Sequence, residues 1–593
     1  MDDAHVEIST RRIGAELLHA ARRHQPDTGL TDTLMDAAMA DPAFKTQLFR
    51  FIDLFPTLRS GAQVYQHLRE YLYREDVHLP RSLRLALKAG GLFRGALRWA
   101  IGSQIDAMAR RFIAGVDVPD ALPRLAERWR DGLGFSIDLL GEACLSDAES
   151  DVYRQRYLTA VEAVADAVGR WPDQPALTRD HLGAIPRGNV SVKITALTAK
   201  VDPVDHEGTL DRLVEGLAPL LDAAGRRGVF INFDMEQYAL KDLTIDLFIR
   251  CAERFTFDGG LALQAYLRDA ERDAQRLIDW AKRAGRRITV RLVKGAYWDY
   301  ETIEAERRNW PVPVWSHKAQ TDACFERLTR RLLEATPRST DDGGIRLALG
   351  SHNARSIAHG LAAAEQLHLP PEAVEIQMLY GMAEGLKRAA VARGLRVREY
   401  VPLGELVPGM AYLVRRLLEN TSNESWLQAG FHHDASDEAL LAPPEPSDHD
   451  TDWVAANRER HRLTPRIENL GDGRAFFNEP LRDFSQSPQR KRFAAAVGAA
   501  TVPKVMFTPP ERAGELVDQA AAAFDHWRGT DAIDRARCLT KAAASFRHDR
   551  DELAGIVLAE AGKPWRHADA DVCEAIDFCE YYARQAVGLF RPQ

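Results

Sequence analysis

Eight short runs of β-branched and apolar residues, separated by helical stretches, constrain the fold of this chain more than any other feature. The intervening stretches are rich in Arg, Ala and Glu, which is typical of helices. The runs are Phe135–Leu140, Val190–Leu197, Val229–Met235, Leu261–Tyr266, Ile288–Val293, Ile345–Ser351, Val374–Leu379 and Val397–Leu403. Eight strand-then-helix units within roughly 300 residues predict an α/β fold of the (β/α)8 TIM-like barrel type. A doubly wound sheet is the alternative, but no G-x-G-x-x-G phosphate loop follows any run.

Helical patterns flank the predicted barrel. Apolar residues recur at three- and four-residue spacings through Thr33–Phe51 and Leu83–Phe112, which predicts helices before the barrel. A polar stretch rich in Pro and His follows the barrel and is typical of a linker. The predicted division is a helical N-terminal arm and α domain (1–130), the barrel (131–428), the linker (429–475) and a second helical segment that looks cut (476–593).

Composition excludes several classes of function. The net charge of the 593 residues is −8, so no general attraction to nucleic acid or to an anionic membrane is expected. The acidic start argues against a signal peptide, and no apolar run approaches the roughly 18 residues that a membrane span needs. Six scattered cysteines without a C-x-x-C pair favour a reducing cytoplasm and argue against a zinc site.

A charged helix is expected just after the last strand. Tyr412, Arg415, Arg416 and Glu419 are spaced so that all four share one face, where a stripe of apolar residues would normally lie. Adjacent arginines repel one another, and a shared anionic ligand would compensate because a guanidinium matches a carboxylate through two hydrogen bonds. A solvated charged face is the alternative.

Polar side chains also stand at nearly every strand end, where the active sites of such barrels lie. They are Asp138, Glu142, Lys193, Asp234, Glu236, Gln264, Arg291, Lys294, His352, Asn353, Gln377, Glu399 and Tyr400. No Ser-His-Asp arrangement is present, and no strand end carries a cysteine, so covalent hydrolysis is disfavoured. Metal hydrolysis is disfavoured because the carboxylates lack a histidine partner. The cationic and aromatic groups suit a small carboxylate substrate beside a phosphorylated aromatic cofactor.

Five motifs carry a resemblance to a known family. Arg291–Asp299 (RLVKGAYWD) and Tyr412–Asn420 (YLVRRLLEN), with Ser191–Leu197, Gln264–Tyr266 and His352–Asn353 in matching order, closely resemble the proline dehydrogenase domain of bacterial proline utilization A proteins. The resemblance extends from the helical N-terminal region to about residue 428.

Three motifs after the linker look like the opening of that family's aldehyde dehydrogenase domain: Phe476–Ser485, Ala523–Trp527 and Glu560–Pro564. The sequence given stops before the nicotinamide-binding core of such a domain, so its second, NAD-dependent oxidation is expected to be missing. Other members carry a ribbon-helix-helix DNA-binding module; this sequence shows none, so no nucleic acid partner is expected.

The resemblance implies an FAD enzyme that oxidises L-proline to Δ1-pyrroline-5-carboxylate and passes electrons to quinone. It implies that Arg415, Arg416 and Lys193 hold the proline carboxylate, and that Tyr400 and Tyr412 wall the ring with Tyr297 close by. Arg291 would donate to the flavin N5 region, Glu142 would pair with Arg415 as a gate, and Asp234 would balance the basic cluster, while Glu419 completes the charged helix face. The residues implied to line FAD are Gln264, Arg291, Val293, Lys294, Gly295, Trp298, Lys318, His352 and Asn353.

Departures from the family pattern are modest. Tyr380 stands where a histidine is expected, and Ser316-His317-Lys318 matches the cofactor-contacting segment loosely. The alternatives are another flavin barrel of the methylenetetrahydrofolate reductase type, or an inactive remnant or scaffold. A cytoplasmic location is expected, and the resemblance leaves open a peripheral contact with the inner face of the membrane and a homo-oligomer.

Overall fold

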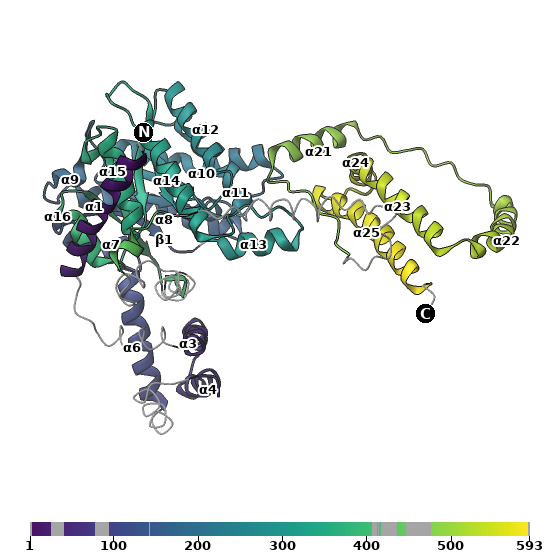
Figure 1. The fold of residues 1–593 in the computed structure, drawn as a ribbon, viewed down its shortest axis with the longest axis horizontal. Helices are drawn as coiled ribbons and strands as arrows, with labels where there is room; N and C mark the ends of the chain where they lie inside the picture. Colours follow the sequence, from purple (N-terminus) through teal and green to yellow (C-terminus); the bar gives the residue numbers. More distant parts are fainter. Residues whose placement is uncertain are drawn as a thin grey trace.

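The computed structural model describes residues 3–24, 41–77, 94–141, 143–405, 409, 412, 414–416, 436–445 and 476–590. A closed barrel of parallel strands lies at its centre with helices around it, and helical segments extend from the barrel in two directions (Figure 1). The barrel confirms the α/β fold predicted from the eight runs and excludes the doubly wound sheet, because a doubly wound sheet would remain open at two edges.

All eight predicted runs form strands of the barrel. The strands are β1 (Leu133–Leu139), β4 (Gly188–Val192), β5 (Val229–Phe233), β6 (Gly259–Gln264), β7 (Arg287–Val293), β8 (Gly344–Gly350), β9 (Val374–Leu379) and β10 (Arg396–Leu403). The first strand closes the barrel because it pairs with β10, at Ser136 and Tyr400, and also with β4, at Asp138 and Ser191.

The strand predicted over Val190–Leu197 was wrong at its end. The β4 strand stops at Val192, and a 3-10 turn, η2 (Ile194–Ala196), follows Lys193. Glu236 accepts hydrogen bonds from the backbone and the hydroxyl of Thr195 and so stabilises this turn. Lys193 therefore lies just beyond the strand, at the mouth of the barrel.

Helices cover the outside of the barrel. They are α8 (Asp147–Val168), α9 (Pro175–Thr178), α10 (His206–Arg227), α11 (Tyr238–Arg254), α12 (Ala270–Arg283), α13 (Trp298–Arg307), α14 (Lys318–Glu334), α15 (Ala354–Gln366), η3 (Pro371–Ala373) and α16 (Glu384–Ala392). A two-stranded hairpin, β2 (Arg179–Asp180) with β3 (Gly183–Ala184), was not predicted, because strands of two residues carry no periodic signal.

The N-terminal helices form three separate packings. They are α1 (Asp3–Arg23), α3 (Pro42–Leu54), η1 (Phe55–Thr57), α4 (Gly61–Leu72), α6 (Arg94–Phe112) and α7 (Val118–Arg130). The first helix lies along α15 and α16, where Ile13 and Leu17 pack with Ile357 and Leu386 (Figure 1). In contrast, α3, α4 and α6 share their own apolar cluster, which also takes in Tyr412. The third packing is that of α7, whose Val118 and Trp129 join the apolar core of the barrel.

One short part of the predicted linker packs on the barrel. Leu440 and Leu441, at the end of α19 (Asp437–Leu440), join the apolar cluster of α1 and α15. The Arg355 guanidinium donates to the Leu441 carbonyl at 2.6 Å. The rest of the predicted linker lies outside the described residues.

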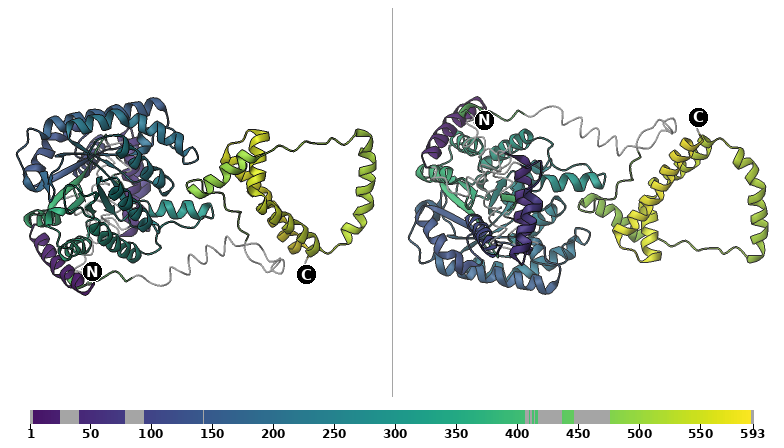
Figure 2. Two further views of the ribbon diagram at one scale, coloured as in Figure 1. Left: turned by 90° about the horizontal axis from the view of Figure 1, so that it is seen from above. Right: turned by 90° about the horizontal axis from the view of Figure 1, so that it is seen from below.

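The C-terminal helices lie beside the barrel (Figure 2). They are α21 (Ser487–Ala499), η5 (Pro510–Arg512), α22 (Ala513–Gly529), α23 (Ala532–His548), α24 (Arg550–Ala561) and α25 (Trp565–Leu589). Phe484, Phe493 and Ile576 form their buried core, and Arg566 pairs with Asp202 of the barrel at 2.8 Å. Every residue of α22 is exposed, in agreement with its position far from the other helices in Figure 1.

In the part of the chain that the structure describes, no helix is long and apolar enough to cross a membrane. Within the same ranges, no group of His, Cys, Asp and Glu side chains is arranged to hold a metal ion.

Candidate active site

Four buried charged side chains and the half-buried Tyr400 meet inside the barrel, toward the C-terminal ends of its strands. We call Asp138, Lys193, Asp234, Arg291 and Tyr400 the inner cluster. They come from β1, from the residues just after β4 and β5, from β7 and from β10. The interiors of such barrels are normally filled by branched apolar side chains, so this concentration of charge is unusual for packing alone.

Asp234 is the centre of the inner cluster. Its Oδ1 accepts a hydrogen bond from Arg291 Nη1 at 2.8 Å, and its Oδ2 accepts one from the Tyr400 hydroxyl at 2.6 Å. Lys193 Nζ lies 3.7 Å from Asp234 Oδ2 and donates to Asp138. The Arg291 guanidinium carbon lies 5.1 Å from the centre of the Tyr400 ring. One carboxylate thus links both cations and the phenol.

The surroundings fix the charge states of these groups. Burial opposes the charged form of Lys193, but Asp138, Tyr400 and Asp234 outweigh it and raise the pKa of Lys193 well above its usual value. Burial raises the pKa of Tyr400, so the phenol keeps its proton, and burial also raises the pKa of Asp138. The cluster therefore presents a stable ammonium, that of Lys193, at neutral pH.

The charged helix lies partly within the described residues. The Arg415 guanidinium carbon is 5.2 Å from the centre of the Tyr297 ring, and that of Arg416 is 5.1 Å from the Tyr412 ring. Arg416 and Tyr412 are buried, whereas Arg415 and Tyr297 are half-buried. Each arginine therefore lies against one of the tyrosines predicted at the substrate: Arg416 against Tyr412, and Arg415 against Tyr297. Glu142 and Glu419, the predicted gate and the fourth residue of the helix face, lie outside the described residues.

The cofactor-lining residues predicted at the ends of β6 and β7 present a mixture of donors and acceptors. Gln264 donates from Nε2 to the Glu236 carbonyl at 3.1 Å, and its buried Oε1 has no hydrogen-bond partner among the described residues. Lys294 and Lys318 share the carboxylate of Asp322, each at 2.5 Å. Burial lowers the pKa of Lys294, although Asp322 opposes this effect.

The following loop brings backbone and aromatic groups close together. Gly295 has a φ of +139°, and a Cβ there would lie 2.4 Å from the Tyr266 ring, so only glycine fits. Val293 ends β7 and is half-buried. Trp298 opens α13, is 43% exposed, and donates from Nε1 to the Trp315 carbonyl at 2.8 Å.

Two predicted cofactor residues follow β8. His352 Nε2 accepts the backbone N–H of Leu379 at 2.9 Å. Burial, with smaller effects from Lys387 and Arg416, lowers the pKa of His352 to about 3, so the ring is neutral and carries its proton on Nδ1. The side chain of Asn353 instead caps α15, accepting from Ser356 N at 3.2 Å.

Two residues that the sequence analysis noted at strand ends, without assigning them a role, complete the site. Asp138 is the partner of Lys193, and Gln377 accepts from Arg291 Nε at 2.6 Å. Their positions at strand ends were visible in the sequence, but their partners depend on the register across the barrel. Ser136 and Ser191, which both accept from Arg291 Nη2 at 3.1 Å, gave no signal beyond their presence in strands.

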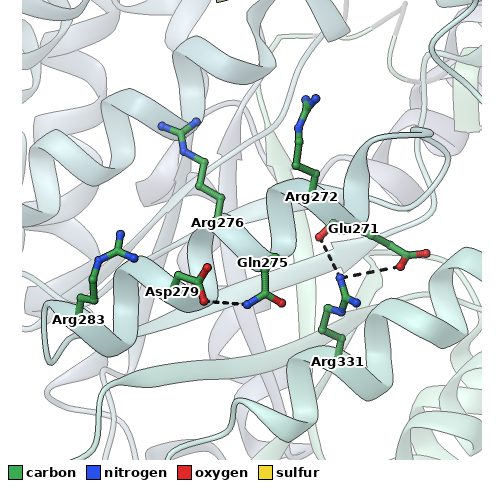
Figure 3. A pocket seen from close by; sticks show the side chains of 7 residues that line it. All are labelled: Glu271, Arg272, Gln275, Arg276, Asp279, Arg283 and Arg331. Carbon is green, nitrogen blue, oxygen red and sulfur yellow. Dashed lines mark hydrogen bonds and ion pairs between the residues drawn. The ribbon is translucent and has the colours of Figure 1, made fainter.

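A surface hollow of about 490 Å³ lies between α12 and α14 (Figure 3). Its lining residues are Glu271, Arg272, Gln275, Arg276, Asp279, Arg283 and Arg331. Arg272 and Arg276 are paired with Asp269 and Asp246. None of the residues of the inner cluster lines this hollow, so it is not the candidate site.

The closed parallel barrel, with polar side chains gathered at the C-terminal ends of its strands, defines a (β/α)8-barrel enzyme. Residues 121–429 match the family model described as proline dehydrogenase. The chain belongs to the proline dehydrogenase family. Residues 7–112 match the proline utilization A N-terminal domain, and residues 487–590 match the aldehyde dehydrogenase family.

Known relatives agree with the family assignment. The bifunctional protein PutA of Escherichia coli (strain K12) is 27% identical over 605 residues, covering 94% of this chain and 44% of that protein. The proline dehydrogenase of Deinococcus radiodurans is 28% identical, covering 55% of this chain and 90% of that protein. The crystal structure of proline utilization A from Bdellovibrio bacteriovorus inactivated by N-propargylglycine has a TM-score of 0.85 and 35% identity, covering 99% of this chain and 62% of that chain. The chain thus spans less than half of the PutA sequence from Escherichia coli.

Proposed function

We propose that this chain oxidises L-proline to Δ1-pyrroline-5-carboxylate with FAD as the bound oxidant and a quinone as the electron acceptor. The observation that carries the proposal is the inner cluster, in which Lys193 and Arg291 share Asp234 inside a barrel of the proline dehydrogenase family. The family assignment favours this function over a reductase of the methylenetetrahydrofolate type. Among the described residues, each side chain that the proposed reaction requires is present, which argues against an inactive remnant.

The substrate carboxylate would be held by cations. Arg415 and Arg416 are two adjacent guanidiniums, and Lys193 remains an ammonium because of its acidic neighbours. A guanidinium binds a carboxylate through two parallel hydrogen bonds, which fixes the orientation of the substrate. Tyr400 and Tyr412 supply the walls for the apolar ring of proline, with Tyr297 close by.

The reaction needs a neutral amine and a fixed C–H bond. The cationic side chains favour loss of the proton from the ring nitrogen of proline to water. The C–H bond of the ring carbon next to nitrogen then breaks, and the nitrogen lone pair forms the C=N bond. Bound FAD would supply the acceptor for the released hydride and its two electrons. The side chains contribute by orienting the substrate and by excluding water.

The residues at the strand ends fit a flavin dinucleotide. The unpartnered Gln264 Oε1 offers an acceptor to an N–H of the flavin ring, and Lys294 and Lys318 offer cations to phosphate. Gly295 permits close approach of the backbone, and Val293, Trp298 and His352 supply the remaining wall, with Asn353 fixing the start of α15.

The partners and the domain division remain part of the proposal. We assign 1–130 to the N-terminal helical region, 131–428 to the barrel, 429–475 to the linker and 476–593 to the aldehyde dehydrogenase-like segment. Electrons would pass to a quinone. The protein would be cytoplasmic or would contact the inner face of the membrane, and it would be a monomer or a homo-oligomer.

The visible spectrum of the purified protein, recorded before and after anaerobic addition of L-proline, tests the proposed function. We expect a flavin band that L-proline bleaches and that D-proline and alanine leave unchanged. A flavin band that L-proline does not alter would exclude the proposed substrate. A well-folded protein without any flavin would exclude the proposed cofactor.

A further inference from the structure

A continuous column of hydrogen-bonded polar side chains runs down the interior of the barrel beneath the inner cluster. Arg291 Nε donates to Gln377 Oε1 at 2.6 Å, and Gln377 Nε2 donates to Glu375 Oε1 at 2.6 Å. Arg398 donates to Glu375 with Nε at 2.8 Å, and Arg396 Nε lies 3.1 Å from the same carboxylate. All of these side chains are buried. The column therefore connects the site to the opposite end of the barrel.

The group between the two charged ends of this column must both accept and donate, and the amide of Gln377 does so. A guanidinium has donors and no acceptor, whereas an ionised carboxylate has acceptors and no donor. Burial alone would raise the pKa of Glu375, but Arg398 and Arg396 outweigh it and lower that pKa to about 2. Gln377 therefore must point its oxygen at Arg291 and its nitrogen at Glu375, and this fixes its orientation.

The bonds of Arg291 leave one donor unused. A guanidinium has five N–H groups. Gln377 and Asp234 each take one, at Nε and Nη1, while Ser136 and Ser191 take two from Nη2. The second N–H of Nη1 has no partner among the described residues. The guanidinium plane is thus fixed by bonds on all three nitrogens, with one donor left for a bound group.

The amide also adds no negative charge beside Arg291. The inner cluster contains two cations, Lys193 and Arg291, and two carboxyl groups, Asp138 and Asp234. Gln377 adds a hydrogen bond without adding a negative charge. A glutamate at position 377 would have nearly the same shape, but it would neutralise Arg291 and face the carboxylate of Glu375.

We propose that Gln377, oriented by Glu375, is a positioning residue that fixes the plane of Arg291 and leaves its charge and its remaining N–H available to the flavin. The inference rests on the proposed function. Gln377 acts through Arg291 and touches neither substrate nor cofactor.

The test compares Gln377→Glu, which keeps the shape and adds a charge, with Gln377→Met, which removes the hydrogen bond. Flavin content, the flavin midpoint potential and the rate of flavin reduction by L-proline are measured in the intact chain. We expect both variants to retain flavin and to reduce it more slowly, on the order of 100-fold, which is typical of a misplacement of about 1 Å. Gln377→Glu should also shift the midpoint potential to more negative values, because the added carboxylate disfavours electron uptake.

Gln47→Glu is the matched control, since Gln47 is a buried glutamine of α3 outside the barrel. It should leave the potential and the rate unchanged. The inference would be overturned if both Gln377 variants reduced flavin at the wild-type rate with unchanged potential, if Gln47→Glu produced the same changes, or if both Gln377 variants lost flavin. A wild-type protein whose flavin does not respond to L-proline would instead overturn the proposed function.

Discussion

Two buried lysines of this barrel have similar partners but lie in very different places. Lys193 belongs to the inner cluster and lies near Asp138 and Asp234. Lys387, on the outer side of the barrel, donates to Glu384 at 2.8 Å and to Glu399 at 2.5 Å. Arg128 of α7 also donates to both of these glutamates. We call Arg128, Glu384, Lys387 and Glu399 the outer network.

Adjacent residues of one strand separate the two regions. Glu399 and Tyr400 follow one another in β10, and successive side chains of a strand point to opposite faces. Glu399 therefore joins α7 and α16 to the sheet, whereas Tyr400 faces the interior and donates to Asp234. Burial and ion pairing alone do not identify a functional lysine. What distinguishes the two is the side of the sheet, because Lys193 follows β4 into the barrel mouth whereas Lys387 belongs to α16 outside it.

The largest expected effect is a loss of stability, which should be greater when Lys387 is replaced than when Lys193 is replaced. Lys387→Met leaves the buried Glu399 and the half-buried Glu384 with only Arg128, so the free energy of unfolding should fall by about 3–5 kcal/mol. Lys193→Met should cost less, about 1–3 kcal/mol, because Asp138 can take up a proton when its partner is removed. Urea unfolding measures both values.

The KM for proline should change in the opposite order, more in Lys193→Met than in Lys387→Met. Folded Lys387→Met should keep the wild-type KM for proline, whereas Lys193→Met should raise it. The double variant Lys387→Met with Glu399→Leu removes one member of each charge type, and we expect it to regain part of the lost stability. Equal loss of activity in both single variants would contradict the distinction between the two regions.

A smaller effect concerns pH and uses a second matched pair, His352 at the site and His359 under α1. Burial lowers the pKa of each to about 3. Between that value and about 6.5, the pKa expected in the unfolded chain, the unfolded state binds a proton that the folded state does not. The free energy of unfolding should therefore decrease as the pH falls, by about 1.4 kcal/mol per pH unit for each histidine.

His359→Gln should remove one of these two contributions, since glutamine can still accept the hydrogen bond from Arg330. The slope of unfolding free energy between pH 6.5 and 5 should flatten accordingly, while the KM for proline stays at the wild-type value. An unchanged slope would show that His359 takes up a proton in the folded state.

The smallest effect on stability is expected at Arg415. Because its side chain is only half-buried and stacks on Tyr297, Arg415→Ala should change the free energy of unfolding by no more than about 0.5 kcal/mol. The KM for proline should nevertheless rise about 10-fold or more, as expected for loss of a charged hydrogen bond to the carboxylate. FAD content should not change.

Arg308→Ala is the control for this prediction, since Arg308 also lies over an aromatic ring, that of Trp310, at 4.7 Å. It should affect neither the KM for proline nor the FAD content. Loss of flavin from Arg415→Ala in proportion to the loss of activity would assign Arg415 a structural role.

Much of the fold was predictable because the strands of a parallel barrel are buried on both faces and form continuous apolar runs. All eight runs were found, but the end of β4 was not, because a turn stabilised by Glu236 is a tertiary effect. The hairpin of β2 and β3 was too short to detect.

The residue types of the candidate site could be predicted from the sequence, but few of the contacts between those residues could. Polar residues at strand ends indicated that Lys193, Asp234, Arg291 and Tyr400 would come together, as they do. The partnership of Arg291 with Gln377 could not be predicted, since it depends on strand register and on the rotamers of both side chains.

The docking of α1 on α15 has a consequence for synthesis of the chain. Glu7 pairs with Arg355, which lies 348 residues later in the sequence. At about 5–20 residues per second, a ribosome needs roughly 20–70 s to make the intervening chain. Throughout that interval, the apolar face of α1 has no native surface to cover it, so α1 must wait for a helix that is made long after it before it can reach its place.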